Sequence, residues 1–244
     1  MHPRPRRRHG VVRAQYNRVL VVVALVVLLP VIVVGERVRR GVGRRIARWG
    51  VSVVAALCGV RFEVRGRPSS SSTPSVVVPN HSSPMDIPAL LWADRDVRFM
   101  AAADLFHIPL LAAAMRALRA VPIDRRDRDR ADRQVDDLVR EVRAGYSGAI
   151  AIFAEGGIAP FGQRLPFKSG AFSLAIRTGS PVVPVVIHGS DRVLRPRGRL
   201  LVRPGLVTVE FLDAIETVGL TFDDRQVLRD HVRDLICGTV AAAT

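Results

Sequence analysis

The sequence predicts a single α/β domain with a largely parallel sheet flanked by helices, preceded by an N-terminal membrane-associated helical segment. Three observations support this fold class. Strand-like and helix-like segments alternate from residue 75 onward, which is the order of a parallel sheet with crossover helices. The strand-like segments are nearly continuous in apolarity, as strands covered on both faces tend to be. An uncharged apolar run with many flanking arginines occupies the N-terminal part.

On composition, the chain of 244 residues divides into three parts. Residues 1–65 form a basic anchor, residues 66–74 a Ser- and Pro-rich linker, and residues 75–244 the domain, with its core motifs in 75–190. Strands are expected in the apolar runs at 75–79, 97–101, 149–154, 182–188 and 206–212. Helices are expected between and after them, at 84–93, 110–118, 129–144, 168–178 and 223–240.

Two apolar runs lie in the anchor, at residues 19–34 and 49–60. As a helix the first run is about 24 Å long, short of the roughly 30 Å hydrocarbon core of a bilayer. It either barely spans, or enters and leaves one leaflet and pairs with the second run as a helical hairpin. Six arginines lie on each side of it, so the positive charge does not choose an orientation. A cleaved signal peptide is the competing interpretation, but no small-residue cleavage site follows residue 34.

The net charge of +15 is carried almost entirely by arginine, since Lys168 is the only lysine. Such a chain suits a polyanionic partner, either nucleic acid or an anionic membrane. Aromatic residues make up only 5% of the chain, which is poor material for base stacking. We therefore expect membrane lipids as partners and no nucleic acid. Cys58 and Cys237 lie far apart in apolar surroundings and no cluster has metal-ligand spacing, so the sequence predicts neither a disulfide nor a metal site.

An imidazole and a carboxylate lie five positions apart in Asn80-His81-Ser82-Ser83-Pro84-Met85-Asp86. Five is the wrong spacing for one face of a helix, but it works if the histidine lies just outside the helix. With Ser83 as N-cap and Pro84 in the first helical position, Asp86 falls third and can reach back toward His81. A carboxylate that holds one imidazole nitrogen leaves the other available as a base. The alternative interpretation is a loop histidine beside a capping aspartate.

Four short blocks occur in a fixed order along the domain. They are Asn80-His81-x4-Asp86, Val121-Pro122-Ile123-Asp124-Arg125, Phe153-Ala154-Glu155-Gly156-Gly157 and Pro181-Val182-Val183-Pro184-Val185. On these blocks the chain resembles the glycerophospholipid acyltransferase family, from about residue 75 to residue 190. The resemblance implies acyl transfer from acyl-CoA or acyl-carrier protein to a lysolipid hydroxyl, with no further cofactor. It also implies an enzyme at the cytoplasmic face of the cell membrane, with 1-acylglycerol-3-phosphate as the favoured acceptor and phosphatidic acid as product.

The resemblance makes His81 the general base and Asp86 the group that orients its ring. Arg125 is a candidate contact for the acceptor phosphate, because a guanidinium matches phosphate oxygens. Glu155, Gly156 and Gly157 end an apolar segment, where glycines let the backbone approach a ligand or an oxyanion. Lys168 is a candidate contact for a phosphate or for the thioester donor. Each of these last five positions also has a plain interpretation, as part of a turn or as a charged surface residue.

The third block departs from the family pattern Phe-Pro-Glu-Gly-Thr-Arg-Ser. Ala154, Gly157, Ile158 and Ala159 stand here at the Pro, Thr, Arg and Ser positions. This departure keeps open a second acceptor class, a lyso-aminolipid or another lysophospholipid. A third interpretation is a basic protein that binds membranes or nucleic acid without catalysis.

Overall fold

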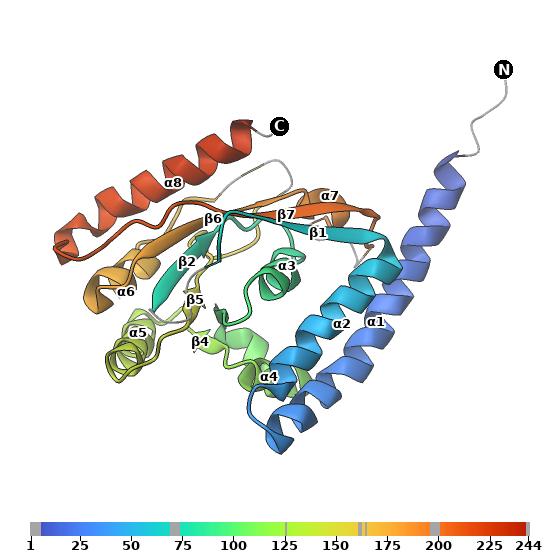
Figure 1. The fold of residues 1–244 in the computed structure, drawn as a ribbon, viewed down its shortest axis with the longest axis horizontal. Helices are drawn as coiled ribbons and strands as arrows, with labels where there is room; N and C mark the ends of the chain where they lie inside the picture. Colours follow the sequence, from blue (N-terminus) through green and yellow to red (C-terminus); the bar gives the residue numbers. More distant parts are fainter. Residues whose placement is uncertain are drawn as a thin grey trace.

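The computed structural model describes residues 6–68, 74–124, 126–160, 163, 165–195 and 201–242, with side chains placed for all of these except 6–12, 14 and 128. Within these residues the chain forms a seven-stranded sheet of order β1-β7-β6-β2-β5-β3-β4 (Figure 1). The strands are β1 (Val60–Arg65), β2 (Ser75–Pro79), β3 (Arg98–Ala102), β4 (Val121–Ile123), β5 (Ala149–Ala151), β6 (Val182–His188) and β7 (Gly205–Phe211).

The sheet is largely parallel, as the sequence predicts. Strands β6, β2, β5, β3 and β4 run in one direction. The antiparallel pairing of β7 with β6 reverses the direction, and β1 then pairs parallel to β7. Strand β2 is central: Val76 pairs with Ile150 on one side and with Val182 on the other. All five β2 residues are buried, which explains why four of them, from Val76 to Pro79, are apolar.

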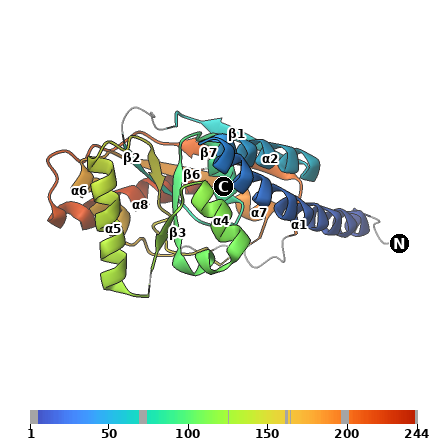
Figure 2. The ribbon, with the colours of Figure 1, turned by 90° about the horizontal axis from the view of Figure 1, so that it is seen from below.

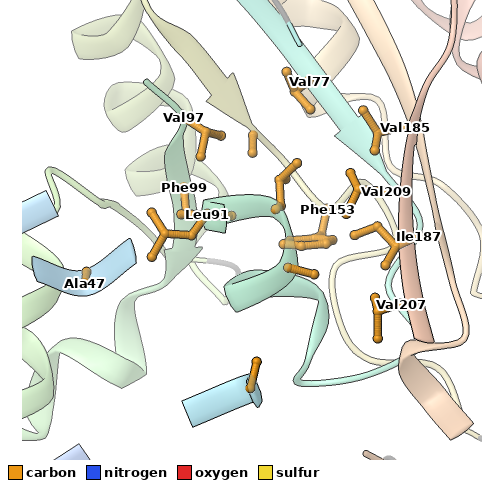
Figure 3. Close-up of a cluster of buried hydrophobic side chains, with 14 of the residues drawn as sticks. Ala47, Val77, Leu91, Val97, Phe99, Phe153, Val185, Ile187, Val207 and Val209 are labelled. Carbon is orange, nitrogen blue, oxygen red and sulfur yellow. The ribbon is translucent and has the colours of Figure 1, made fainter. Parts of the chain in front are cut away.

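Helices cover both faces of the sheet (Figures 1 and 2). The long ones are α1 (Arg6–Val38), α2 (Val42–Cys58), α3 (Asp86–Ala93), α4 (Pro109–Ala117), α5 (Arg128–Arg143), α6 (Gly170–Thr178) and α8 (Arg225–Ala242). The short ones are η1 (Ala103–His107), α7 (Ser190–Val193) and η2 (Phe222–Asp224). One buried cluster joins the sheet to α2, α3 and α4, and Figure 3 shows part of it, including Leu91, Phe153 and Val209. A second cluster joins the opposite face to α5, α6 and α8.

The two N-terminal apolar runs form an antiparallel helical hairpin of α1 and α2 (Figure 1). One face of α2 contributes Ala47, Ala55 and Cys58 to the domain core. Helix α1 packs along α2 and α4 but leaves most of its apolar surface exposed, Val19 and Val26 being more than 60% accessible. Within the described residues, Gln15–Val38 is long and apolar enough to cross a membrane by length and composition alone.

The helix is longer than the sixteen-residue run suggests. At 1.5 Å per residue the 24 residues of Gln15–Val38 extend about 36 Å, because the helix continues beyond the apolar run at both ends. The uncharged run itself keeps its length of about 24 Å, so its spanning or re-entrant course stays a prediction.

Several boundaries differ from the sequence prediction for identifiable reasons. Residues Val60–Arg65, which we assigned to the anchor, form the edge strand β1 of the sheet. Strand β5 ends at Ala151 rather than at residue 154, because the chain turns and Gly156 N–H donates to the Phe153 carbonyl at 3.0 Å. Helix α6 begins at Gly170, two residues after the predicted start, because the backbone N–H of Lys168 donates to the Ala154 carbonyl instead.

Candidate functional site

Asn80 holds the chain in place where it leaves the central strand β2. Its side-chain Oδ1 accepts a hydrogen bond from the backbone N–H of Ile187 at 2.7 Å, and its Nδ2 donates to the Ile187 carbonyl at 3.2 Å. The amide thus continues the pairing of β2 with β6 beyond the last strand residue. The next residue, His81, therefore begins at a fixed point at the carboxyl ends of these parallel strands, where ligands of α/β sheets commonly bind.

His81 and Asp86 are in direct contact. The imidazole Nδ1 lies 2.9 Å from Oδ2 of Asp86, whose side chain is fully buried. The same Oδ2 accepts hydrogen bonds from the backbone N–H groups of Ser82 at 2.8 Å and Ser83 at 2.9 Å. Because a carboxylate only accepts, the neutral ring carries its proton on Nδ1 and leaves Nε2 as an acceptor.

The local turn that makes this contact differs slightly from the predicted cap. Helix α3 begins at Asp86, two residues later than expected, after a turn over residues 83–86 in which Asp86 N–H donates to the Ser83 carbonyl at 3.1 Å. Ser83 still receives the Met85 N–H on its Oγ at 3.0 Å, and that hydroxyl donates to the Leu194 carbonyl at 2.6 Å. The predicted reach of Asp86 back to His81 is present, while its catalytic role stays a prediction.

Phe153 and Glu155, which follow β5, support His81 from two sides. The ring of Phe153 stacks on the imidazole with centroids 3.9 Å apart and 25° between the planes. Oε1 of Glu155 accepts a hydrogen bond from the backbone N–H of His81 at 2.9 Å, and Oε2 accepts from Leu165 N–H at 3.3 Å. Both carboxylate oxygens of Glu155 therefore accept hydrogen bonds from the protein's own backbone. Glu155 thus positions His81 rather than contacting a substrate.

Burial raises the pKa of the Glu155 carboxyl above its ordinary value of 4.5, although the hydrogen bonds from His81 and Leu165 oppose this effect. The folded chain therefore keeps this proton after the unfolded chain has released it. The contribution of Glu155 to the free energy of unfolding is full below pH 4.5 and is lost as the pH rises through the folded-state pKa. We expect the stability of Glu155→Gln, relative to wild type, to improve as the pH rises above 4.5.

Denaturant unfolding at several pH values measures this difference. The exposed Glu63 on β1 supplies the control, and Glu63→Gln should follow the wild-type pH dependence. Parallel curves for wild type and Glu155→Gln over the whole range would show that the Glu155 proton is not linked to folding.

The loop after Glu155 brings Gly156 and Lys168 together. Gly156 has a φ of +71°, in the left-handed region, and a Cβ placed there would lie 2.9 Å from Cε and 3.0 Å from Nζ of Lys168. The Lys168 side chain is exposed and is not among the residues that line the cavity described below. Gly156 and Lys168, both predicted site residues, thus lie next to each other. Lys168 does not line the cavity that contains His81 in its wall.

Gly156→Ala should destabilise this loop, because an alanine in the left-handed region costs about 1–2 kcal/mol. The melting temperature should fall, and turnover should fall with it because the adjacent Glu155 holds the His81 backbone. Gly157→Ala is the matched control, since a Cβ at Gly157 meets only Leu165 Cδ1 at 3.8 Å. Equal melting temperatures for the two variants would contradict the expected strain.

Arg125 lies outside the described residues. It follows β4, which is the edge strand of the sheet and is separated from β2 by β5 and β3. Its predicted phosphate contact therefore stays a prediction. Among the described residues no group of three or more His, Cys, Asp or Glu side chains could hold a metal ion.

A cavity of about 900 Å³ opens beside His81. Its wall includes four charged or titratable residues that the sequence did not identify as site residues: Arg65 at the end of β1, His188 at the end of β6, and Asp191 and Arg192 on α7. His188 places Nε2 2.9 Å from Oε2 of Glu210. The one signal in the sequence that could have identified Arg192 is its position just beyond the end of a parallel strand, where ligands of α/β sheets commonly bind.

Fold and site together define an α/β protein that presents a histidine–carboxylate pair at the carboxyl end of its central strand, beside a substrate-sized cavity. The chain belongs to the acyltransferase family, whose model matches residues 61–188. Its fold is that of the crystal structure of the 1-acyl-sn-glycerophosphate acyltransferase PlsC from Thermotoga maritima. The two superpose with a TM-score of 0.78 over 98% of this chain and 97% of that one, at 23% sequence identity.

Curated relatives carry related names. A 1-acyl-sn-glycerol-3-phosphate acyltransferase beta of Homo sapiens is 33% identical over 186 residues, covering 75% of this chain and 66% of the relative. The chloroplastic 1-acyl-sn-glycerol-3-phosphate acyltransferase BAT2 of Brassica napus is 32% identical over 184 residues, covering 74% of this chain and 52% of the relative. The chain thus spans about half to two thirds of the length of these relatives.

Proposed function

We propose that this protein transfers a fatty acyl group from a thioester, acyl-CoA or acyl-carrier protein, to the free hydroxyl of 1-acylglycerol-3-phosphate, giving phosphatidic acid. The observation that carries the proposal is the contact of His81 Nδ1 with Asp86 Oδ2 at 2.9 Å, in a ring that lines the cavity. Family membership and the acceptor in the relatives' names support it.

In the proposed reaction His81 Nε2 takes the proton of the acceptor hydroxyl as that oxygen attacks the thioester carbonyl. Asp86 stabilises the imidazolium that forms. The tetrahedral intermediate then expels the thiolate, which takes the proton back from the imidazolium and leaves as a thiol. One C–O bond forms, one C–S bond breaks, and no covalent acyl-enzyme is needed.

The exposed apolar face of α1 supports a membrane location for this reaction. An amphiphilic acceptor resides in the bilayer, and a protein held on one leaflet can take the acceptor from it. We place the domain on the cytoplasmic face, where the thioester donors are made. The many arginines around α1 favour an anionic lipid surface.

One observation favours a second acceptor class. Ile158, 37% exposed, stands in the loop after Glu155 at the position where the family pattern has an arginine. A lysolipid with a different headgroup, such as a lyso-aminolipid, is therefore the second candidate acceptor.

A panel of lysolipid acceptors tests both candidates. Purified full-length protein in mixed micelles is given acyl-CoA and each acceptor in turn, and products are identified by mass. Phosphatidic acid as the dominant product supports the proposal. Turnover only with another lysolipid assigns that acceptor instead, and no acyl transfer to any lysolipid leaves a basic membrane-binding protein without this activity.

A further inference from the structure

Two arginines from elements distant in the sequence line the cavity that contains His81. Arg192 lies on α7, directly after β6, and Arg65 is the last residue of β1. Neither forms a salt bridge with any carboxylate in the described part of the chain, in contrast to His188, which pairs with Glu210. Two arginines without such an ion pair therefore line one cavity, together with the acidic residues Asp191 and Glu155.

Helix α7, which carries Arg192, contacts the residue that follows the proposed base. Ser82, the residue after His81, places its hydroxyl oxygen 3.2 Å from that of Ser190, which begins α7. Arg192 is two residues further on in the same short helix. In the register of β1 and β7, Arg65 pairs with the acidic Glu210, whereas Val193 of α7 approaches Gly205 at the start of β7. The cavity wall thus carries one arginine on α7 and a second on β1.

The loop after Glu155 contributes no such cation among its described residues. Its cavity-lining members are Glu155 itself, Ala159, Pro160 and Gln163. Both oxygens of Glu155 accept backbone hydrogen bonds. Of the described side chains around the cavity, Arg192 and Arg65 are therefore the permanent positive charges available to an anionic substrate group.

We propose that Arg192, with Arg65, forms the subsite that binds a phosphate group of the substrate; this rests on the proposed acyl transfer. A guanidinium always carries its charge and can offer two parallel N–H donors to phosphate oxygens. The phosphate belongs either to the acceptor headgroup or to the nucleotide of acyl-CoA. Both sources present the same chemistry to the arginines, and the choice of substrates separates them.

The test measures kcat/KM of Arg192→Gln and Arg65→Gln with paired substrates. The acceptors are 1-acylglycerol-3-phosphate and the phosphate-free monoacylglycerol, and the donors are acyl-CoA and acyl-pantetheine, which lacks the nucleotide phosphates. A lost charge-assisted contact should lower kcat/KM about 10- to 100-fold for the phosphate-bearing substrate only. A loss confined to the phosphate-bearing acceptor assigns the subsite to the headgroup, and a loss confined to acyl-CoA assigns it to the donor.

Arg61→Gln is the matched control. Arg61 is an exposed arginine on the same face of β1 as Arg65, four residues earlier, and it does not line the cavity. Its variant should keep wild-type kcat/KM with all four substrates. If Arg192→Gln and Arg65→Gln behave as Arg61→Gln does, or lose activity equally with and without phosphate, the subsite is elsewhere.

A binding measurement separates failure of this inference from failure of the proposed function. Calorimetric titration of the full chain with glycerol 3-phosphate and with CoA requires no turnover. Weaker binding of one of these ligands in Arg192→Gln, but not in Arg61→Gln, supports the subsite even if the wild type fails to acylate 1-acylglycerol-3-phosphate. Acylation of that lipid by wild type, with unchanged binding and kinetics in the arginine variants, keeps the function and overturns the subsite.

Discussion

His81→Ala should lower kcat by about 100- to 10,000-fold, the usual range for loss of a general base. The ring lines the cavity and contacts the buried Asp86. Its removal leaves the acceptor hydroxyl without a proton acceptor in position, while the backbone contacts of residue 81 with Glu155 and Ala159 do not depend on the side chain. Steady-state and single-turnover acyl transfer measure the loss, and circular dichroism and thermal unfolding check that the fold is kept.

His107→Ala is the matched control, because His107 is an exposed histidine on η1 and does not line the cavity. Its turnover should equal that of wild type. A His81→Ala protein that is folded and retains wild-type turnover would remove His81 as the base, and with it the mechanism proposed for this site.

The sequence was most informative where structure is decided locally. Strands β2 and β6 have the predicted bounds, because each is a short, mainly apolar run that ends at a turn. The His81–Asp86 contact was also predictable, since it depends on a single turn and on a carboxylate that reaches backward over five residues.

Strand β1 was missed for a physical reason. Its sequence alternates apolar and charged residues, Val60-Arg61-Phe62-Glu63, which suits an edge strand with one exposed face. The run continues directly from the apolar helix α2, and what makes it a strand is its pairing with β7 far along the chain. No local pattern shows such a long-range pairing.

The same limit applies to the cavity wall. The strand order β1-β7-β6-β2 is what brings three residues from distant segments into the wall of one cavity: Arg65 on β1, His188 on β6 and Arg192 on α7. The motif blocks contain the predicted base and its carboxylate, whereas Arg65, His188 and Arg192, which line the same cavity, belong to segments outside these blocks. This is why the reaction class could be predicted more closely than the substrate.

Asp86→Asn should lower kcat by about 100- to 10,000-fold without a comparable loss of stability. Oδ2 of Asp86 accepts all three of its hydrogen bonds, from His81 Nδ1 and from the backbone N–H groups of Ser82 and Ser83. Oδ1 is buried and has no partner in the described structure. An asparagine can keep its carbonyl at the Oδ2 position, which preserves the three hydrogen bonds of the turn. Its amide nitrogen then lies at the buried Oδ1 position, so the variant loses the negative charge and also buries an amide group without an acceptor, at a cost of about 1–3 kcal/mol.

Asp86→Ala provides the contrast. It removes the acceptor altogether and leaves the Ser82 and Ser83 N–H groups unpaired in a largely buried turn, at a cost of about 1–3 kcal/mol each. Unfolding of both variants, measured beside their acyl-transfer rates, then separates two roles of one carboxylate. A folded Asp86→Asn with near wild-type kcat would mean that the charge does not stabilise the imidazolium. Equal destabilisation of the two variants would mean that an oxygen acceptor at the Oδ2 position does not by itself stabilise the turn.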